Sequence, residues 1–251
     1  MKNGTTKSIF SLLLHPTRMV ISDEQDEALK GFVRSLPMLF QTNQGTLLYK
    51  GRNELRVFVH EGQEMVVKAF ARPHILNRLI YGILRKSKAQ RSYEYARRLR
   101  QEGLGSPMPV AWLTERNGLL FTRSYYVSLK STCPYTYRDI QDGKVVPRSE
   151  EERYLRLVAR FVARLHDRGM LHRDLSQGNV LFGPGDEVEL IDLNRIRFRR
   201  VGMEEGCRNL SERLLANRRQ REILATTYAE ARGFDKAECL KIVSQYNGIK
   251  D

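Results

Sequence analysis

The chain has few acidic residues, few cysteines and no long apolar run. Its 251 residues include 29 Asp and Glu against 43 Lys and Arg, which gives a net charge of +14. The three cysteines form no CxxC pair, which excludes a disulfide framework and a zinc knuckle and favours a reducing compartment. No stretch approaches the roughly 20 apolar residues that span a bilayer, and residues 9–14 are too short for a signal peptide. We therefore expect a cytoplasmic chain.

The surplus of positive charge indicates a polyanionic partner and says nothing about the fold. Candidate partners are nucleic acid, a phosphorylated ligand and an acidic membrane surface. Nucleic acid is not expected, because the sequence has neither a basic sheet interleaved with aromatic residues nor a recognition-helix motif. The hydrophobic fraction of 41% is that of a globular protein, which excludes a disordered chain.

Residue patterns in the first half predict a small antiparallel sheet with helices beside it. A first helix is expected over 24–34, with Ser22 available as its cap. Apolar residues then predict five strands, and a strongly basic helix follows the third of them, from about Ile75 to Gln101. The predicted strands are 46–49, 55–59, 65–70, 110–115 and 119–127.

The second half is predicted to be mostly helical, with one hairpin. Ser149 and Glu152 have the spacing of a capping box, and apolar residues recur at helical spacing until Gly169. Two short strands, 180–182 and 188–192, follow, and helices are expected from about Glu204. The predicted fold class is α+β. The expected domains are an N-terminal helical extension over 1–39, a sheet-containing lobe over 40–128 and a helical lobe over 129–251.

A polar loop before this hairpin carries the residues suited to chemistry. Residues 172–179 read HRDLSQGN, which matches H-R-D-L-x-x-x-N, and Asp192 ends the predicted strand thirteen residues after Asn179. Asp174 can orient an attacking hydroxyl and accept its proton, while Asn179 and Asp192 can hold Mg²⁺ against ATP phosphates. Neighbouring strands would bring the three side chains to one edge. The expected cofactors are therefore ATP and Mg²⁺.

With this motif the sequence resembles the protein-kinase-like superfamily, and more closely the bacterial lipopolysaccharide kinases that phosphorylate Kdo or heptose in the inner core. The resemblance runs from about residue 24 to 214. It implies a bilobal protein-kinase-like fold with a five-stranded antiparallel N-lobe and a small, mostly helical C-lobe. The segments that carry the likeness to the smaller family are 49–53, 67–70, 88–89 with 91–96, 105–109, 124–126 and 191–195.

The resemblance also implies roles for residues of the N-lobe. Lys68 would bind the α- and β-phosphates, and Glu94, the only acid between Lys68 and Gln101, would support it. Together with Asp174, these two are the expected catalytic residues. The remaining residues that would contact the nucleotide are Gly51, Arg52, Asn53, Tyr126 and Val127.

The surplus charge gathers in two segments. Residues 68–100 contain ten Lys and Arg against one acid, and Arg195 and Arg197 follow the metal-binding Asp192. Arg195 and Arg197 are the expected acceptor-binding residues, whereas His172 and Arg173 would be scaffold for the catalytic loop. An anionic glycolipid such as lipid A–core, presented at the inner leaflet, would meet both basic segments favourably. We expect transient contact with that membrane and no obligate protein partner.

Departures from ordinary protein kinases favour a small acceptor. The chain has no G-x-G-x-x-G and no Ala-Pro-Glu, and only 59 residues follow Asp192. The predicted activity is transfer of the ATP γ-phosphate to an alcohol group of the inner core, with Kdo favoured over heptose. The alternatives are a small atypical protein kinase, a small-molecule phosphotransferase of the same fold and a non-catalytic pseudokinase scaffold.

Overall fold

The protein is described from a computed structural model, and the structure describes residues 17–71, 86–117, 120–143, 145, 148–212, 214 and 217–246. The chain forms two compact units, and each is described by itself. The sheet unit comprises residues 1–97 and 108–130, and the helical unit comprises 98–107 and 131–251. The first part of the predicted basic helix, 75–85, lies outside the described residues; its later part is helix α4 (Lys88–Gln101).

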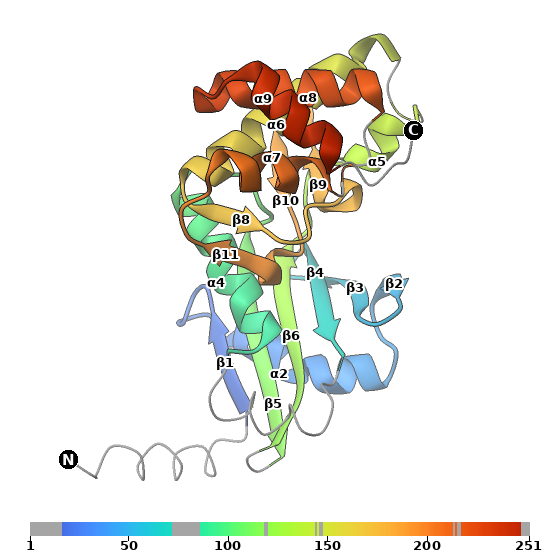
Figure 1. Ribbon diagram of the computed structural model, residues 1–251. Helices are drawn as coiled ribbons and strands as arrows, with labels where there is room; N and C mark the ends of the chain where they lie inside the picture. Colours follow the sequence, from blue (N-terminus) through green and yellow to red (C-terminus); the bar gives the residue numbers. More distant parts are fainter. Residues whose placement is uncertain are drawn as a thin grey trace, which may run out of the picture. The chain divides into compact units, whose positions relative to one another are not determined.

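The sheet unit contains one antiparallel sheet of six strands, in the order β1-β5-β6-β4-β3-β2 (Figure 1). The five predicted strands are all present, and β1 is the one strand beyond them. It is an edge strand that pairs with β5 from Thr17↔Glu115 to Ile21↔Ala111. A strand of five residues that pairs with a segment so far along the chain has little pattern of its own in the sequence, which explains why β1 was not predicted. The strands are β1 (Thr17–Ile21), β2 (Thr46–Lys50), β3 (Glu54–His60), β4 (Gln63–Phe70), β5 (Pro109–Asn117) and β6 (Leu120–Leu129).

Helix α2 (Glu27–Gln41) begins and ends later than predicted. Its N-cap is Asp26 instead of Ser22, and the Asp26 carboxylate accepts a hydrogen bond from the Leu29 backbone N–H at 2.7 Å. Pro37 lies inside the helix, where the missing N–H would normally end it. Packing overrides this preference, because the apolar face of α2 is buried in the core on one side of the sheet. The buried residues of that face are Leu29, Val33, Leu36 and Phe40.

Strand alternation assigns the side chains of the central strands to two cores. Val67 and Val127 belong to the core that includes α2. Phe70 and Trp112 belong to the other core, which includes Ala89 and Tyr93 of α4, with Tyr126 packed against it. The α4 side of the sheet is therefore the side on which the even-numbered residues of β4 and β6 lie.

Within the described residues, the helical unit combines the α-helices α5 to α9 with two small sheets, of order β10-β9-β7 and β11-β8. The predicted hairpin is confirmed as β9 (Val180–Phe182) and β10 (Val188–Leu190), but β10 ends before Asp192. The other strands are β7 (Tyr135–Thr136), β8 (Met170–His172) and β11 (Ile196–Phe198). The helices are α5 (Tyr137–Gln141), α6 (Glu151–Asp167), α7 (Met203–Ser211), α8 (Arg218–Arg232) and α9 (Lys236–Gln245).

Helix α6 is the long amphipathic helix that the sequence predicts, but its start differs. A single 3-10 turn, η1 (Arg148–Glu150), precedes it, so Glu150 holds the N-cap position and makes no side-chain cap hydrogen bond. The predicted capping box therefore does not form. Glu152, its expected partner, instead pairs with Arg156 one helical turn later at 2.7 Å.

Candidate active site

The catalytic loop connects β8 to β9 and is closed by hydrogen bonds on both sides of Asp174. The Asp174 backbone N–H donates to Nδ1 of His172 at 3.1 Å. The Asn179 side-chain amide donates to the Asp174 carbonyl at 2.8 Å. Asn179 ends the turn η2 (Gln177–Asn179), which leads directly into β9. The backbone of Asp174 is thus held from two sides, which leaves its carboxylate to make other contacts.

His172 is fully buried, and its role as scaffold for the catalytic loop stays a prediction. Because Nδ1 accepts a hydrogen bond, a neutral ring carries its proton on Nε2. Burial lowers the pKa of His172, which keeps the ring in this neutral form. Arg173, the other predicted scaffold residue, is exposed.

Asp192 lies beside Asn179 because the hairpin pairing continues past the end of β10. The Ile191 backbone N–H donates to the Asn179 carbonyl at 3.0 Å. Asp192 itself adopts a left-handed conformation, with φ 56° and ψ 45°, which few residues other than glycine tolerate. Its carboxylate is held by Asn194, whose amide donates to Oδ1 at 2.5 Å. Backbone strain of this kind is concentrated at functional sites.

The donor set of Asn179 and Asp192 fits Mg²⁺. Asn179 uses its NH₂ group on Asp174, so its carbonyl oxygen is the atom that can face a cation. Mg²⁺ takes oxygen ligands and is usually bound by one or two carboxylates together with phosphates and waters. Within the described residues, no cluster of three or more His, Cys, Asp or Glu forms a metal site. These two residues would therefore hold the ion together with ATP phosphates.

Arg195 brings a positive charge directly to the predicted base. It ends the turn η4 (Leu193–Arg195), and its Nη1 lies 3.0 Å from Oδ2 of Asp174. Arg197, the second predicted acceptor-binding residue, is exposed on β11, which pairs with β8. The helical unit therefore gathers Asp174, Asn179 and Arg195 around one loop.

Lys68 and Tyr126 are neighbours in the sheet unit. They are directly opposite in the β4–β6 pairing, on the α4 side of the sheet, and Nζ of Lys68 lies 5.4 Å from the centre of the Phe70 ring. Val127, by contrast, points its side chain into the α2 core and is fully buried. If Val127 contacts a nucleotide, only its backbone can do so.

The predicted phosphate-covering turn joins β2 to β3. The Gly51 N–H donates to the Asn53 carbonyl at 3.0 Å, which makes the turn tight. A Cβ added to Gly51 would come within 2.4 Å of the Tyr49 hydroxyl, so a larger residue at this position would displace the exposed Tyr49 side chain. The Asn53 side chain accepts from the Ala71 N–H at 3.3 Å, which ties the turn to the end of β4. Arg52 at its tip is exposed.

Glu94 lies on α4 and contacts two residues that precede it in the chain. Its carboxylate accepts from Nζ of Lys86 at 2.7 Å and from the Gln90 side chain at 3.0 Å. The predicted pairing of Glu94 with Lys68 stays a prediction.

A buried hydrogen-bond chain holds the catalytic loop and was not predicted. Tyr228 of α8 bonds Nδ1 of His166 at 2.8 Å, and Nε2 of His166 bonds Oδ1 of Asn209 at 3.1 Å. The Asn209 amide then donates to the His172 carbonyl at 3.0 Å. A polar residue on the apolar face of α6, His166, was the feature of the sequence that could have indicated this chain. No sequence pattern indicated Asn209, because its hydrogen-bond partners come from other elements.

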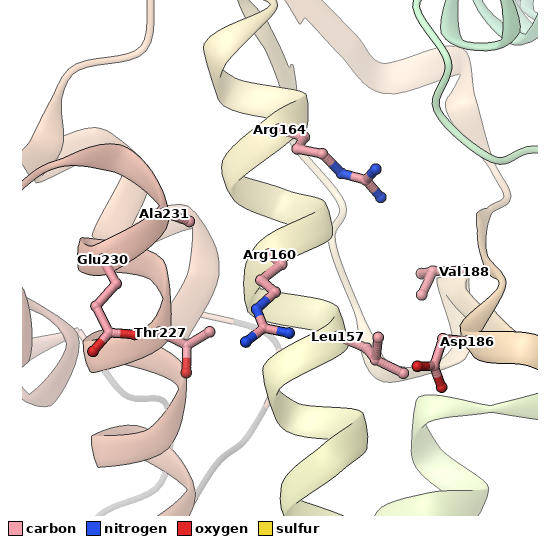
Figure 2. Close-up of a pocket in the computed structure, with 8 residues that line it drawn as sticks. All are labelled: Leu157, Arg160, Arg164, Asp186, Val188, Thr227, Glu230 and Ala231. Atoms are coloured by element: carbon pink, nitrogen blue, oxygen red, sulfur yellow. The ribbon is translucent and has the colours of Figure 1, made fainter.

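The helical unit also has a groove of about 540 Å³, and Figure 2 shows the residues that line it. It lies between α6, α8 and the segment 186–188, and none of the predicted site residues lines it. Both of its acids are engaged elsewhere, because Asp186 pairs with Arg153 and Glu230 with Lys236. The lining residues are Leu157, Arg160, Arg164, Asp186, Val188, Thr227, Glu230 and Ala231.

An antiparallel sheet unit combined with a helical unit that carries the H-R-D-L-x-x-x-N loop defines a protein-kinase-like phosphotransferase. The sequence matches the family described as Lipopolysaccharide kinase (Kdo/WaaP) family over residues 49–246. The chain belongs to this family and is a kinase.

Solved structures and curated relatives agree with this class. The structure of WaaP in complex with acyl carrier protein matches 91% of this chain and 97% of that chain, with a TM-score of 0.59 at 18% identity. The human hormonally up-regulated neu tumor-associated kinase is 28% identical over 113 residues. A putative cyclin-dependent kinase F-2 from rice (Oryza sativa subsp. japonica) is 32% identical over 65 residues.

These curated relatives are much longer than the matched region. The match covers 44% of this chain and 16% of the human kinase, and 26% of this chain and 20% of the rice protein. None of the described helices is both long and apolar enough to cross a membrane.

Proposed function

We propose that this kinase transfers the γ-phosphate of ATP to a sugar hydroxyl of the lipopolysaccharide inner core, with Kdo favoured over heptose. The observation that carries the proposal is the pair of contacts made to Asp174 of the catalytic loop. The Asn179 amide donates to the Asp174 carbonyl, and Arg195 donates to the Asp174 carboxylate. A base, a metal-binding amide and a cation suited to an anionic acceptor are thus within one short segment of the fold.

In the proposed reaction, Asp174 orients the sugar hydroxyl and accepts its proton. The bond between that oxygen and the γ-phosphorus forms as the bond from the γ-phosphorus to the β–γ bridging oxygen breaks, and ADP leaves. Mg²⁺, when bound, neutralises charge on the phosphates. Asn179 and Asp192 would hold the ion, while Lys68, supported by Glu94, would position the α- and β-phosphates.

The proposed acceptor is anionic, since Kdo carries a carboxylate and lipid A carries phosphates. Arg195 and Arg197 would bind these groups, because guanidinium ions match carboxylate and phosphate oxygens in pairs. The exposed Arg173 adds a third cation to the same loop region. Such a surface would also be attracted to the anionic inner leaflet, which supports the proposal that the reaction takes place at the cytoplasmic face of the membrane.

The test is phosphate transfer from labelled ATP to purified Kdo-containing lipid A by the purified chain. Mass spectrometry should find one added phosphate on a Kdo residue, and the core of a strain that lacks the gene should have lost that phosphate. Addition to heptose would correct the acceptor within the core. Transfer to protein or to an aminoglycoside, with none to the core, would contradict the proposal and favour the alternatives.

The same assay tests whether the chain needs a protein partner for activity. The WaaP structure contains acyl carrier protein, whereas the sequence of this chain leads us to propose that it needs no obligate protein partner. The purified chain alone should then transfer phosphate at its full rate. Activity that appears only after acyl carrier protein is added would overturn this part of the proposal.

A further inference from the structure

Arg195 contacts the carboxylate that the proposed reaction uses as its base. Its Nη1 lies 3.0 Å from Oδ2 of Asp174, and the two side chains are 56% and 22% exposed. A hydrogen bond between two ionised groups is about twice as strong as a neutral one. A sugar hydroxyl that approaches Oδ2 of Asp174 must therefore compete with Arg195 for this oxygen.

The fold fixes the position of the Arg195 backbone but leaves the guanidinium group exposed to solvent. On one side, Leu193 and Asn194 are buried and anchor the turn. On the other side, β11 pairs with β8 through Ile196↔His172, which brings the backbone of Arg195 alongside the catalytic loop. The backbone is thus held at two points next to Asp174, while the guanidinium group can turn.

The exposed guanidinium group can bind a second anion. It carries five N–H donors in a planar fork that matches the two oxygens of a carboxylate or a phosphate, and its contact with Asp174 is made by Nη1. An ion pair between partly exposed side chains is weak. A bidentate anionic ligand can therefore displace it.

We propose that Arg195 alternates between Asp174 and the anionic group of the acceptor, an inference that rests on the proposed function. Without an acceptor, Arg195 occupies the base. When an acceptor binds, Arg195 turns to its sugar carboxylate and leaves Oδ2 of Asp174 to the sugar hydroxyl. Arg195 thus favours acceptors whose hydroxyl lies near a carboxylate, because a neutral sugar has no group that draws Arg195 away from the base.

The same contact limits wasteful ATP hydrolysis. If water attacks the γ-phosphorus, a water oxygen–phosphorus bond forms, the bond to the β–γ bridging oxygen breaks, and the water proton must go to a base. Asp174 is the base on this loop, and Arg195 engages it until an anionic acceptor arrives. Acceptor-free hydrolysis is therefore suppressed in the wild-type chain.

The experiment compares two acceptors that differ only in the charge of the Kdo carboxylate, Kdo-containing lipid A with a single Kdo and the same molecule as its methyl ester. The full chain is assayed for transfer to each and for ATP hydrolysis without acceptor. In Arg195→Gln we expect kcat/KM for the acid form to fall about tenfold relative to that for the ester, as loss of one charge-assisted hydrogen bond implies. Acceptor-free hydrolysis should rise severalfold. Arg160→Gln, an equal charge change on α6, should behave as the wild type.

The outcomes separate the two proposals. If the wild type transfers phosphate to neither acceptor, the proposed function fails. If it transfers phosphate but Arg195→Gln keeps both the preference for the acid form and the low hydrolysis rate, the role of Arg195 is wrong and the function stands. Should Arg195→Gln fail to fold, Arg195→Lys decides. Lysine keeps the charge without the fork, so a wild-type preference and hydrolysis rate in this variant would overturn the inference.

Discussion

Asp174 combines a fixed backbone with a carboxylate that contacts a mobile cation. Hydrogen bonds from its own N–H and to its own carbonyl hold the loop, and Arg195 reaches the carboxylate from the neighbouring turn. The motif in the sequence was sufficient to identify Asp174, Asn179 and Asp192 as candidates. The contact between Arg195 and the Asp174 carboxylate could not be predicted. It depends on the pairing of β8 with β11, and these two three-residue strands have no pattern in the sequence.

Replacement of Asp174 by asparagine should abolish most of the activity without unfolding the protein. Asparagine preserves the size and the backbone hydrogen bonds but cannot accept the proton of the attacking hydroxyl. We expect kcat to fall by about 100-fold or more, with little change in KM for ATP. Steady-state kinetics measure both values, and thermal unfolding serves as the control. A kcat within threefold of the wild type would exclude Asp174 as the base.

The buried His166 should make the protein less stable in mild acid. Burial lowers the pKa of His166 to about 3 from its ordinary 6.5, so the unfolded chain binds a proton below pH 6.5 that the folded chain does not. Its contribution to stability is complete above the unfolded pKa and is lost as the pH falls from 6.5 towards 3. At pH 5 the loss should be about 2 kcal/mol relative to pH 7.

Urea unfolding at pH 7 and pH 5 measures this loss, and His166→Gln provides the matched control. Glutamine can replace one of the hydrogen bonds but does not titrate. The variant should therefore be less stable than the wild type at pH 7 and lose less between pH 7 and pH 5. Equal losses in the two proteins would show that other groups cause the acid sensitivity.

The elements that could be predicted are those whose pattern is local. The long strands β3, β4 and β6 each contain a run of apolar, aromatic or β-branched residues, and α6 has an apolar face of its own. The sixth strand β1 is held by distant pairing, and α2 continues past Pro37 because the sheet supports its last turn. Tertiary contacts, which no local window contains, decide these elements.

Helix α7 should influence catalysis through Asn209. Its amide donates to the His172 carbonyl, and its carbonyl oxygen bonds His166. Asn209→Asp keeps the bond to His166 but removes the donor to the loop. We expect kcat to fall by about tenfold with KM for ATP unchanged, since the base loses its alignment, and the free energy of unfolding to fall by about 1 kcal/mol.

Tyr228→Phe is the matched control for Asn209→Asp, because it breaks the far end of the same chain. Its hydroxyl bonds His166 and accepts from Arg232 at 2.9 Å, and neither contact touches the loop. This variant should lose stability and keep its kcat. If both variants lose stability while both keep the wild-type kcat, the chain is structural only and Asn209 does not position the base.

At the scale of the whole molecule, the net charge of +14 distinguishes this chain from an ordinary enzyme of its size. Part of the positive charge surrounds the catalytic loop, at Arg173, Arg195 and Arg197, and it matches the anionic acceptor that we propose. A surplus this large also produces a long-range field that attracts anionic surfaces and weakens with salt. Membrane contact is therefore expected to be electrostatic and reversible.

Binding to lipid vesicles tests this expectation. The full chain should sediment with vesicles that contain about one-third anionic phospholipid at low salt, and binding should fall by tenfold or more when the salt is raised to about 0.5 M, because the Debye length then shrinks to a few ångströms. Vesicles of neutral phosphatidylcholine alone should bind little. Salt-insensitive binding to neutral vesicles would require an apolar insertion instead. Because Arg195→Gln removes a single charge, it should weaken vesicle binding only slightly while it changes acceptor preference strongly, which separates recruitment to the membrane from selection of the acceptor.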